Sequence, residues 1–285
     1  MSPQLVWLIT GTSSGFGHDL ALAALKRGEK VIATARAKSI GQLDELRAKG
    51  ADVLELDVTA SLEDLRVVAQ KAIALHGHVD VVVNNAGYGG IGVVEETTPE
   101  DTFRQFNTNV FGALNVARAF LAHMRERKAG TIAWIGSYAG WFSPKGASLY
   151  SASKHALRAI SQSLDEETKG FGVRSIIFEP GYFRTKFITA MDAPRMPRIE
   201  AYVSDFTKMQ EMLAAYDGNQ PGNPAKAADT ILDIVRGEGV AAGRDMPDAI
   251  PLGTDALEGI KDILKRRLAV VEEWEQVSRS TDSWD

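Results

Sequence analysis

The chain has 285 residues, of which 45% are hydrophobic and 24% are charged, so it is long enough to bury one substantial core. Its net charge is −5 and no basic block is interleaved with aromatic residues, which excludes nucleic acid as a main partner because phosphate binding needs a basic face. With no cysteine, disulfides, thiolate metal sites and a cysteine nucleophile are excluded as well.

The histidines and the N-terminus bear on metal binding and location. His76 and His78 are the only close histidine pair, and two positions on a helix end cannot share one face, so no metal site is expected. The opening "MSPQLVWLIT" has no basic region, and no run approaches the ~18 apolar residues of a membrane span. We expect a cytoplasmic protein without stable membrane insertion.

Short apolar segments alternate with helical segments along most of the chain. Gly28 ends the first helix, Ser39 is expected to cap the second and Ser61 the third. Thr98-Pro99 opens a long helix that runs to about residue 127, and another helix covers 150–169. The expected strands are 5–10, 30–35, 52–58, 79–87, 130–137 and 173–181.

These strands are apolar on both faces, as in a parallel sheet covered by helices on both sides. The pattern predicts an α/β fold of Rossmann type, a doubly wound parallel sheet in a single domain over 1–285, with a ligand crevice outside the carboxyl ends of the strands. Residues 182–219 form a long insert before a helix that begins at Asn223-Pro224. Residues 255–278 are expected to be a C-terminal amphipathic helical extension, with apolar residues at Leu257, Ile260, Leu264, Val271 and Trp274.

The glycine-rich stretch "TGTSSGFG" (10–17) follows the first strand and opens the first helix. Glycine there allows a tight turn and a close approach of pyrophosphate to the helix N-terminus. An ordinary strand-to-helix turn is the alternative, but the position at the first β-α junction favours dinucleotide binding. The expected cofactor contacts are Gly11, Ser13, Ser14, Gly15, Phe16 and Gly17.

Two Tyr-x-x-x-Lys pairs occur, Tyr150 with Lys154 and Tyr182 with Lys186. Tyr150 lies on the helix after the fifth strand, so it faces the expected crevice, and Ser137 ends that strand. Residues four apart on a helix are neighbours, so the lysine can reach the phenol. The second pair lies in the insert and has no strand-ending serine before it, so we interpret the first pair as the catalytic one.

The motifs "TGTSSGFG", "NNAG" (84–87), "YSASK" and "PG" (180–181) together resemble those of the short-chain dehydrogenase/reductase family, in its short single-domain branch, over residues 5–190. The tail is more similar to the retinol- and hydroxysteroid-dehydrogenase-like members. The resemblance implies that Ser137 bonds the substrate oxygen, Lys154 holds the nicotinamide ribose and Asn109 anchors a water in a proton relay. Asn107, two positions away, remains the alternative to Asn109.

The family resemblance also implies cofactor contacts at the ends of the later strands. Asp57 is similar to the residue that contacts adenine, Asn85 to one that lines the cleft, and Thr185 to the threonine that bonds the carboxamide. The full implied set is Asp57, Val58, Asn85, Ala86, Gly87, Lys154, Pro180, Gly181 and Thr185.

The end of the second strand bears on the choice of nicotinamide cofactor. Many NAD enzymes carry an acidic residue there for the ribose 2′-OH, but this chain has Ala35 followed by Arg36. A guanidinium can pair with a 2′-phosphate through two hydrogen bonds, although a plain surface arginine is the alternative. NADP(H) is favoured and NAD(H) stays possible.

The chemistry explains why a tyrosine and a lysine are needed together. Hydride reaching a carbonyl carbon leaves an alkoxide, and protonated Tyr150 can donate the proton, so the expected reaction interconverts a ketone or aldehyde and an alcohol. In the reverse direction the phenol, with a pKa of ~10, has to act as a base, and a nearby ammonium from Lys154 is expected to lower that pKa.

Aromatic residues gather near the expected crevice. Most aromatic side chains are core residues, but clusters in the insert and after Ser137 favour a large apolar pocket for a bulky hydrophobic or aromatic substrate. The candidate substrate contacts are Tyr138, Trp141, Phe142, Tyr182 and Phe187.

The sequence also bears on subunit association and on alternative functions. The helices 99–127 and 150–169 resemble the family's subunit interface, which implies a homodimer or homotetramer with a small-molecule substrate. The tail packs on its own core or on a second subunit, since Glu272, Glu273 and Glu275 disfavour an anionic membrane. A cofactor-binding regulator or pseudoenzyme is the main alternative, while an epimerase or dehydratase and a pure interaction protein fit the motifs less well.

Overall fold

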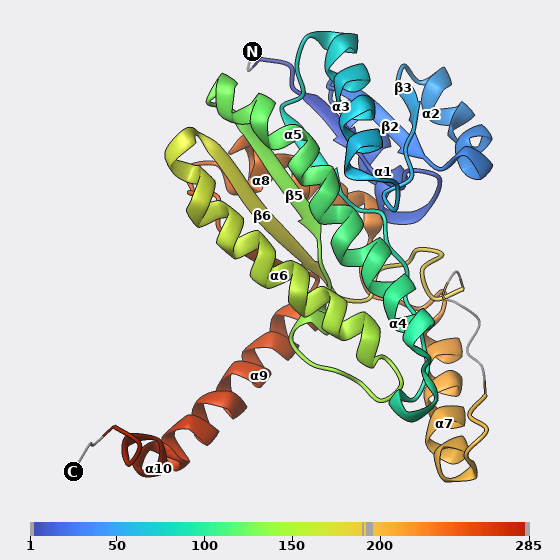
Figure 1. Ribbon diagram of the computed structural model, residues 1–285, viewed down its shortest axis with the longest axis vertical. Helices are drawn as coiled ribbons and strands as arrows, with labels where there is room; N and C mark the ends of the chain where they lie inside the picture. Colours follow the sequence, from blue (N-terminus) through green and yellow to red (C-terminus); the bar gives the residue numbers. More distant parts are fainter. Residues whose placement is uncertain (1–2, 190, 192–195, 283–285) are drawn as a thin grey trace.

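Seven strands form one sheet in the computed structural model, which describes residues 3–189, 191 and 196–282. Their order is β3-β2-β1-β4-β5-β6-β7, and every neighbouring pair is parallel (Figure 1). The strands are β1 (Val6–Ile9), β2 (Lys30–Ala35), β3 (Asp52–Glu55), β4 (Val81–Asn84), β5 (Gly130–Ile135), β6 (Val173–Pro180) and β7 (Ala249–Leu252).

Helices cover both faces of the sheet, as Figure 1 shows. The α-helices of the described residues, including those that do not cover the sheet, are α1 (Gly15–Lys26), α2 (Asp44–Ala48), α3 (Leu62–His76), α4 (Pro99–Phe106), α5 (Ala113–Arg127), α6 (Ser148–Thr168), α7 (Glu200–Tyr216), α8 (Pro224–Arg236), α9 (Thr254–Glu273) and α10 (Glu275–Arg279).

The central strands are buried on both sides, which explains their continuous apolar sequences. Trp7 and Ile9 of β1 point into a core built with α1 and α8, whereas Val6 and Leu8 point into a core built with α3, α5 and α6. Alternate strand residues face opposite sides of a sheet, so each layer of helices buries its own apolar stripe. The expected doubly wound α/β fold is confirmed.

The chain reverses direction across the sheet between β1 and β4. It runs outward from β1 to β2 and β3, then returns to β4 on the other side of β1. At this topological switch point the loops after β1 and β4 diverge and leave a crevice beyond the carboxyl ends of the strands. Gly11 and Asn85, two of the site residues predicted from the sequence, lie within two residues of the ends of these two strands.

Several element boundaries differ from the sequence-based expectation. Ser39 was a wrong helix cap, because it lies inside a 3₁₀ helix (Ala37–Leu43) and α2 begins only at Asp44. The insert 182–219 contains α7, and residues 190 and 192–195 of the insert lie outside the described residues. The expected C-terminal helix 255–278 consists of α9 and α10.

The long helix expected from residue 99 to 127 is interrupted. Thr98 caps it as expected, accepting a hydrogen bond from the backbone N–H of Asp101 at 3.1 Å. The turn Asn107–Gly112 is π-helical and separates α4 from α5. Such turns often occur at functional sites, and this one contains Asn109.

The C-terminal helices leave the body of the protein, with α9 extending away from the sheet in Figure 1. Ala256, Ile260 and Ile263 are buried against the body, but every described residue from 264 to 282 is exposed. Among the helices of the described residues, none has the length and apolarity to cross a bilayer.

Candidate active site

The glycine-rich turn joins the ends of β1 and β4. The Thr10 hydroxyl accepts hydrogen bonds from the backbone N–H groups of Asn85 (2.9 Å) and Ala86 (3.0 Å). The Asn85 amide donates to the carbonyls of Thr10 (2.8 Å) and Gly11 (3.1 Å). A Cβ on Gly11 would lie 2.9 Å from Ala86 Cα, and one on Gly17 only 2.3 Å from Asn85 Nδ2. The two glycines therefore permit this close contact.

The N-terminus of α1 is left without a side-chain cap. Ser14 is its N-cap residue but makes no capping hydrogen bond, and no acidic residue lies in the first turn. By contrast, Ser61 caps α3 and Asn223 caps α8. The free N–H groups and the helix dipole at α1 thus favour an anionic ligand.

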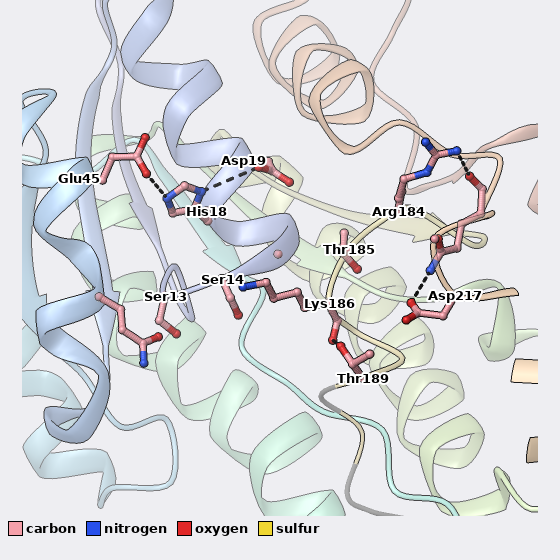
Figure 2. A pocket seen from close by; sticks show the side chains of 14 residues that line it. Ser13, Ser14, His18, Asp19, Glu45, Arg184, Thr185, Lys186, Thr189 and Asp217 are labelled. Carbon is pink, nitrogen blue, oxygen red and sulfur yellow. Dashed lines mark hydrogen bonds and ion pairs between the residues drawn. The ribbon is translucent and has the colours of Figure 1, made fainter. Parts of the chain in front are cut away.

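A cavity of about 710 Å³ lies beside this turn (Figure 2). Figure 2 shows Lys186 extending toward Ser14, and His18 lying between Asp19 (3.8 Å) and Glu45 (3.6 Å). The lining residues are Ser13, Ser14, Gly15, His18, Asp19, Gln42, Glu45, Arg184, Thr185, Lys186, Thr189, Asp217, Gly218 and Gln220. Sequence reasoning missed Arg184 and Lys186 as lining residues, although their place after "PG" could have suggested them.

Lys154 projects from α6 into the interior and is only 6% exposed. Its Nζ donates to the Ile135 carbonyl at 2.7 Å and lies 5.8 Å from the centroid of the Tyr150 ring. A Cβ on Gly87 would lie 3.8 Å from this Nζ and 3.1 Å from Asn109 Oδ1. Gly87, Asn109 and Lys154 therefore meet at the end of β4.

Of the two candidate asparagines, the structure brings Asn109 to this point. Its Nδ2 donates to the Tyr88 carbonyl (3.0 Å) and to Ser153 Oγ (3.1 Å), and its Oδ1 accepts from the Tyr88 N–H (3.1 Å). Within the described residues the Asn107 side chain makes no hydrogen bond. The π-helical turn buries Asn109 and leaves Asn107 half-buried.

Burial dominates the acid-base properties of the Tyr150 and Lys154 pair. It raises the pKa of Tyr150 to about 12, an effect that interaction with Ser137 partly opposes. Burial also lowers the pKa of Lys154 to about 8. The expectation that Lys154 lowers the tyrosine pKa was wrong: burial sets the direction of the shift and Ser137 opposes it, while the Lys154 amine is engaged with the Ile135 carbonyl.

The other expected cofactor residues lie on segments that border the crevice. Arg36 directly follows β2 and is exposed, with no hydrogen bond or ion pair from its side chain to any described residue. Asp57 lies two residues beyond the end of β3 and accepts from the N–H (2.9 Å) and hydroxyl (2.7 Å) of Thr59, while Val58 is buried. Thr185 Cβ lies 3.8 Å from the position of a Cβ on Gly15.

Phe187 is the expected substrate-contacting residue that lies beside Tyr150, with ring centroids 5.6 Å apart. Tyr182 instead packs on Tyr216 of α7 at 4.7 Å, and Phe16 of the glycine-rich turn packs on Phe183 at 5.5 Å. The segment after β6 thus reaches both the tyrosine and the glycine-rich turn.

The aromatic residues after Ser137 pack against one another and against residues of α6, β6 and α9. Tyr138 packs on Phe142 at 4.5 Å, and its hydroxyl lies against Gly259 of α9. Trp141 donates to Glu179 at 2.8 Å, and the Arg158 guanidinium stacks 3.3 Å from its ring centroid. No ring contact joins Tyr138 or Trp141 to Tyr150 among the described residues, so their contact with substrate stays a prediction from the sequence.

Comparison with known proteins identifies the family of this chain. The family model described as short chain dehydrogenase matches residues 5–195, two thirds of the chain. The chain belongs to the short-chain dehydrogenase family. It is 32% identical to the oxidoreductase BOA17 of Botryotinia fuckeliana, over 96% of this chain and 97% of that protein.

Solved structures of short-chain dehydrogenases share the fold. A short-chain dehydrogenase from Streptomyces avermitilis is 38% identical, with a TM-score of 0.85 over 99% of this chain and 100% of that one. The actinorhodin polyketide ketoreductase, solved with NADPH, is 28% identical, with a TM-score of 0.72 over 89% of this chain and 97% of that one. This short-chain dehydrogenase is therefore an oxidoreductase by family, with the family's Rossmann-type sheet.

Proposed function

We propose that this short-chain dehydrogenase is an NADP(H)-dependent oxidoreductase that interconverts a ketone or aldehyde and an alcohol, with Tyr150 as proton donor. The observation that carries the proposal is the meeting of four polar side chains beside the glycine-rich turn. Lys154 and Asn109 lie together at Gly87, and Ser137 interacts with Tyr150. A purely structural tyrosine would not need a buried amine and a paired hydroxyl beside it.

The residues present fit a dinucleotide. The uncapped N-terminus of α1 and the glycine-rich turn offer N–H groups to a pyrophosphate, and Lys186 adds a cation on the same cavity. Asp57, Val58, Asn85, Ala86 and Thr185 border the crevice and would hold the rest. When bound, the cofactor supplies or accepts the hydride.

Arg36 supports a preference for NADP(H) over NAD(H). It follows β2, where Ala35 replaces the acidic residue that would repel a 2′-phosphate, and its side chain is exposed with no partner among the described residues. The ketoreductase with 28% identity was solved with NADPH, which agrees with this assignment.

The acid-base chemistry follows from the geometry around Tyr150. With a pKa of about 12 the phenol keeps its proton at neutral pH, so it can donate that proton to a carbonyl oxygen that gains negative charge. Ser137 would hold the same oxygen through a hydrogen bond. Asn109 would position a water that returns the proton, and Lys154 would hold the nicotinamide ribose.

A bulky hydrophobic or aromatic substrate fits the surroundings of Tyr150. Phe187 lies against the tyrosine ring, and its ring and Met191 both approach Gly89. Phe206 and Met209 of α7 approach Gly146 in the loop before α6. These side chains give an apolar border to the space in front of the tyrosine.

A homodimer or homotetramer through α4, α5 and α6 is the proposed assembly. Phe103 of α4 is 61% exposed and Phe111 of the π-helical turn is 45% exposed. Large exposed apolar side chains on neighbouring helices are typical of subunit interfaces.

The decisive experiment follows NADPH oxidation with a panel of bulky ketones, comparing the wild type with Tyr150→Phe and Tyr216→Phe. Tyr150→Phe should lose at least ~100-fold in rate while still binding NADPH, and the exposed Tyr216→Phe should behave like the wild type. An unchanged rate for Tyr150→Phe would contradict the proposal. Tight NADPH binding without turnover of any carbonyl would favour the regulator instead.

A further inference from the structure

The C-terminal arm, defined here as residues 264–282, stands in solvent with an uncovered apolar face. All of its residues are exposed, although the preceding part of α9 is anchored through Ala256, Ile260 and Ile263. Its large exposed apolar side chains are Leu264, Leu268, Val270, Val271, Trp274 and Val277. Short isolated helices are marginal in water, so an arm of this composition calls for a partner surface.

The apolar side chains of the α9 part of the arm share one side of that helix. At 100° per residue, Leu264, Leu268 and Val271 fall on one stripe, and Val270 and the C-cap residue Trp274 fall next to it, whereas Val277 belongs to the short helix α10. The charged residues Lys265, Arg266, Glu272 and Glu273 lie along the two borders of this face, whereas Arg267 lies within it, between Val271 and Trp274. This arrangement is that of a helix that packs against a second helix.

The α9 part of the arm carries its basic residues before its acidic residues, so two arms in antiparallel orientation bring opposite charges together. Lys265 and Glu272 are seven residues apart and occupy one border of the apolar face, and Arg266 and Glu273 do the same on the other border. A second arm running antiparallel, centred near Leu268, therefore places each basic residue next to an acidic residue of the other copy. A parallel pair would place like charges together.

The ion pairs that these charged residues make with the described residues of their own chain are few and leave them free to pair with a second copy. Arg266 makes one exposed pair with Asp262 at 3.0 Å, and Lys265, Glu272 and Glu273 make no ion pair with any described residue. Exposed pairs of this kind contribute little, so they do not compete strongly with an interface. The acidic residues also disfavour an anionic bilayer as the occupant.

We propose that the C-terminal arms of two copies of this chain pair antiparallel about a twofold axis near Leu268. The contact is isologous, because the same apolar face and the same two charge borders are used on both copies. It is separate from the interface proposed for α4, α5 and α6, and it does not depend on the catalytic proposal.

Single cysteines test the axis directly, since the natural chain has none. Leu268→Cys places a thiol on the apolar face next to the axis, and Ala269→Cys, the matched control, places an exposed thiol on the polar side. Under mild oxidation, Leu268→Cys should run mainly as a disulfide-linked dimer on non-reducing gels, and Ala269→Cys mainly as a monomer. Equal crosslinking of both, or of neither, would overturn the proposal.

Charge reversal tests the pairing without removing apolar side chains. Molar mass by light scattering should fall by half at low protein concentration for Lys265→Glu/Arg266→Glu and for Glu272→Lys/Glu273→Lys, and it should recover when all four changes are combined. Wild-type mass in both double variants would overturn the proposal. So would binding of the wild type to phosphatidylserine vesicles with no Leu268→Cys crosslink in solution.

Discussion

At the residue scale, burial makes the charged forms of Lys154 and Tyr150 costly. Burial holds the pKa of the amine at about 8 and that of the phenol at about 12, so both are pushed toward their neutral forms. A site that retains a buried amine at the expense of stability points to a functional need for it.

Lys154→Met should stabilise the protein at pH 7. The pKa of the amine is lower in the folded protein (about 8) than its ordinary value of 10.5, so its charged form costs roughly 3 kcal/mol of folding free energy below pH 8. Because the unfolded chain keeps this proton longer, wild-type stability rises between pH 8 and 10.5, and the advantage of the variant fades over that range.

Chemical denaturation across pH 7 to 10.5 measures this effect. Lys226→Met, which replaces an exposed lysine of α8, is the control and should show almost no pH-dependent change. A Lys154→Met variant less stable than the wild type at pH 7 would contradict the assigned burial cost.

Arg36→Ala should reduce the preference for NADPH over NADH. A hydrogen bond from an ionised group is worth about 1.5–3 kcal/mol, which corresponds to a ~10–100-fold loss in NADPH affinity with little change for NADH. Calorimetric titration of both cofactors measures it, with Arg66→Ala on α3 as the control. An equal loss for both cofactors would mean that Arg36 does not read the 2′-phosphate.

At the element scale, the start of α9 fastens the segment that follows β6. Asp255 Oδ2 accepts from the Tyr182 N–H at 2.7 Å, and the carboxylate lies against Gly181, where a Cβ would come within 2.3 Å of it. Thr185 and Phe187 follow a few residues later. The C-terminal helix therefore takes part in shaping the crevice, in addition to carrying the arm.

Asp255→Ala should loosen the segment that carries Thr185 and Phe187. We expect a KM for carbonyl substrate raised at least several-fold, with a smaller change in kcat, because the proton donor on α6 is untouched. Steady-state kinetics separates the two, and Asp262→Ala, on the exposed side of α9, is the control. A drop in kcat at unchanged KM would show that Asp255 acts on the chemistry rather than on position.

The elements that sequence alone predicted are those with local signals. The glycine-rich turn, the Thr98 cap and the central strands were predicted because their residues form these features by short-range rules. The π-helical turn around Asn109 was not, since it depends on Gly112 fitting against the Val58 carbonyl, a contact between distant segments. The same holds for α7, which approaches Gly146 through Phe206 and Met209.

At the scale of the whole molecule, the topology explains why residues from six segments meet in one crevice. The order of the strands puts the ends of β1 and β4 side by side, and the loops after β2, β3, β5 and β6 border them. Sequence predicted this crevice from the alternating pattern, but it missed β7. The edge strand β7 contains Pro251, which a sheet tolerates only at its margin, so its sequence reads as a loop.

Binding of NADPH by the intact chain tests the central claim most directly, because it needs no substrate. A thermal-shift titration with NADPH and NADH should show stabilisation by NADPH at far lower concentration. At a hundredfold excess over Kd this is about 2.7 kcal/mol, or roughly 5–10 °C in Tm. The Tyr150→Phe variant should show the same rise in Tm with NADPH as the wild type. No shift with either cofactor would contradict the account, and a preference for NADH would contradict the role of Arg36.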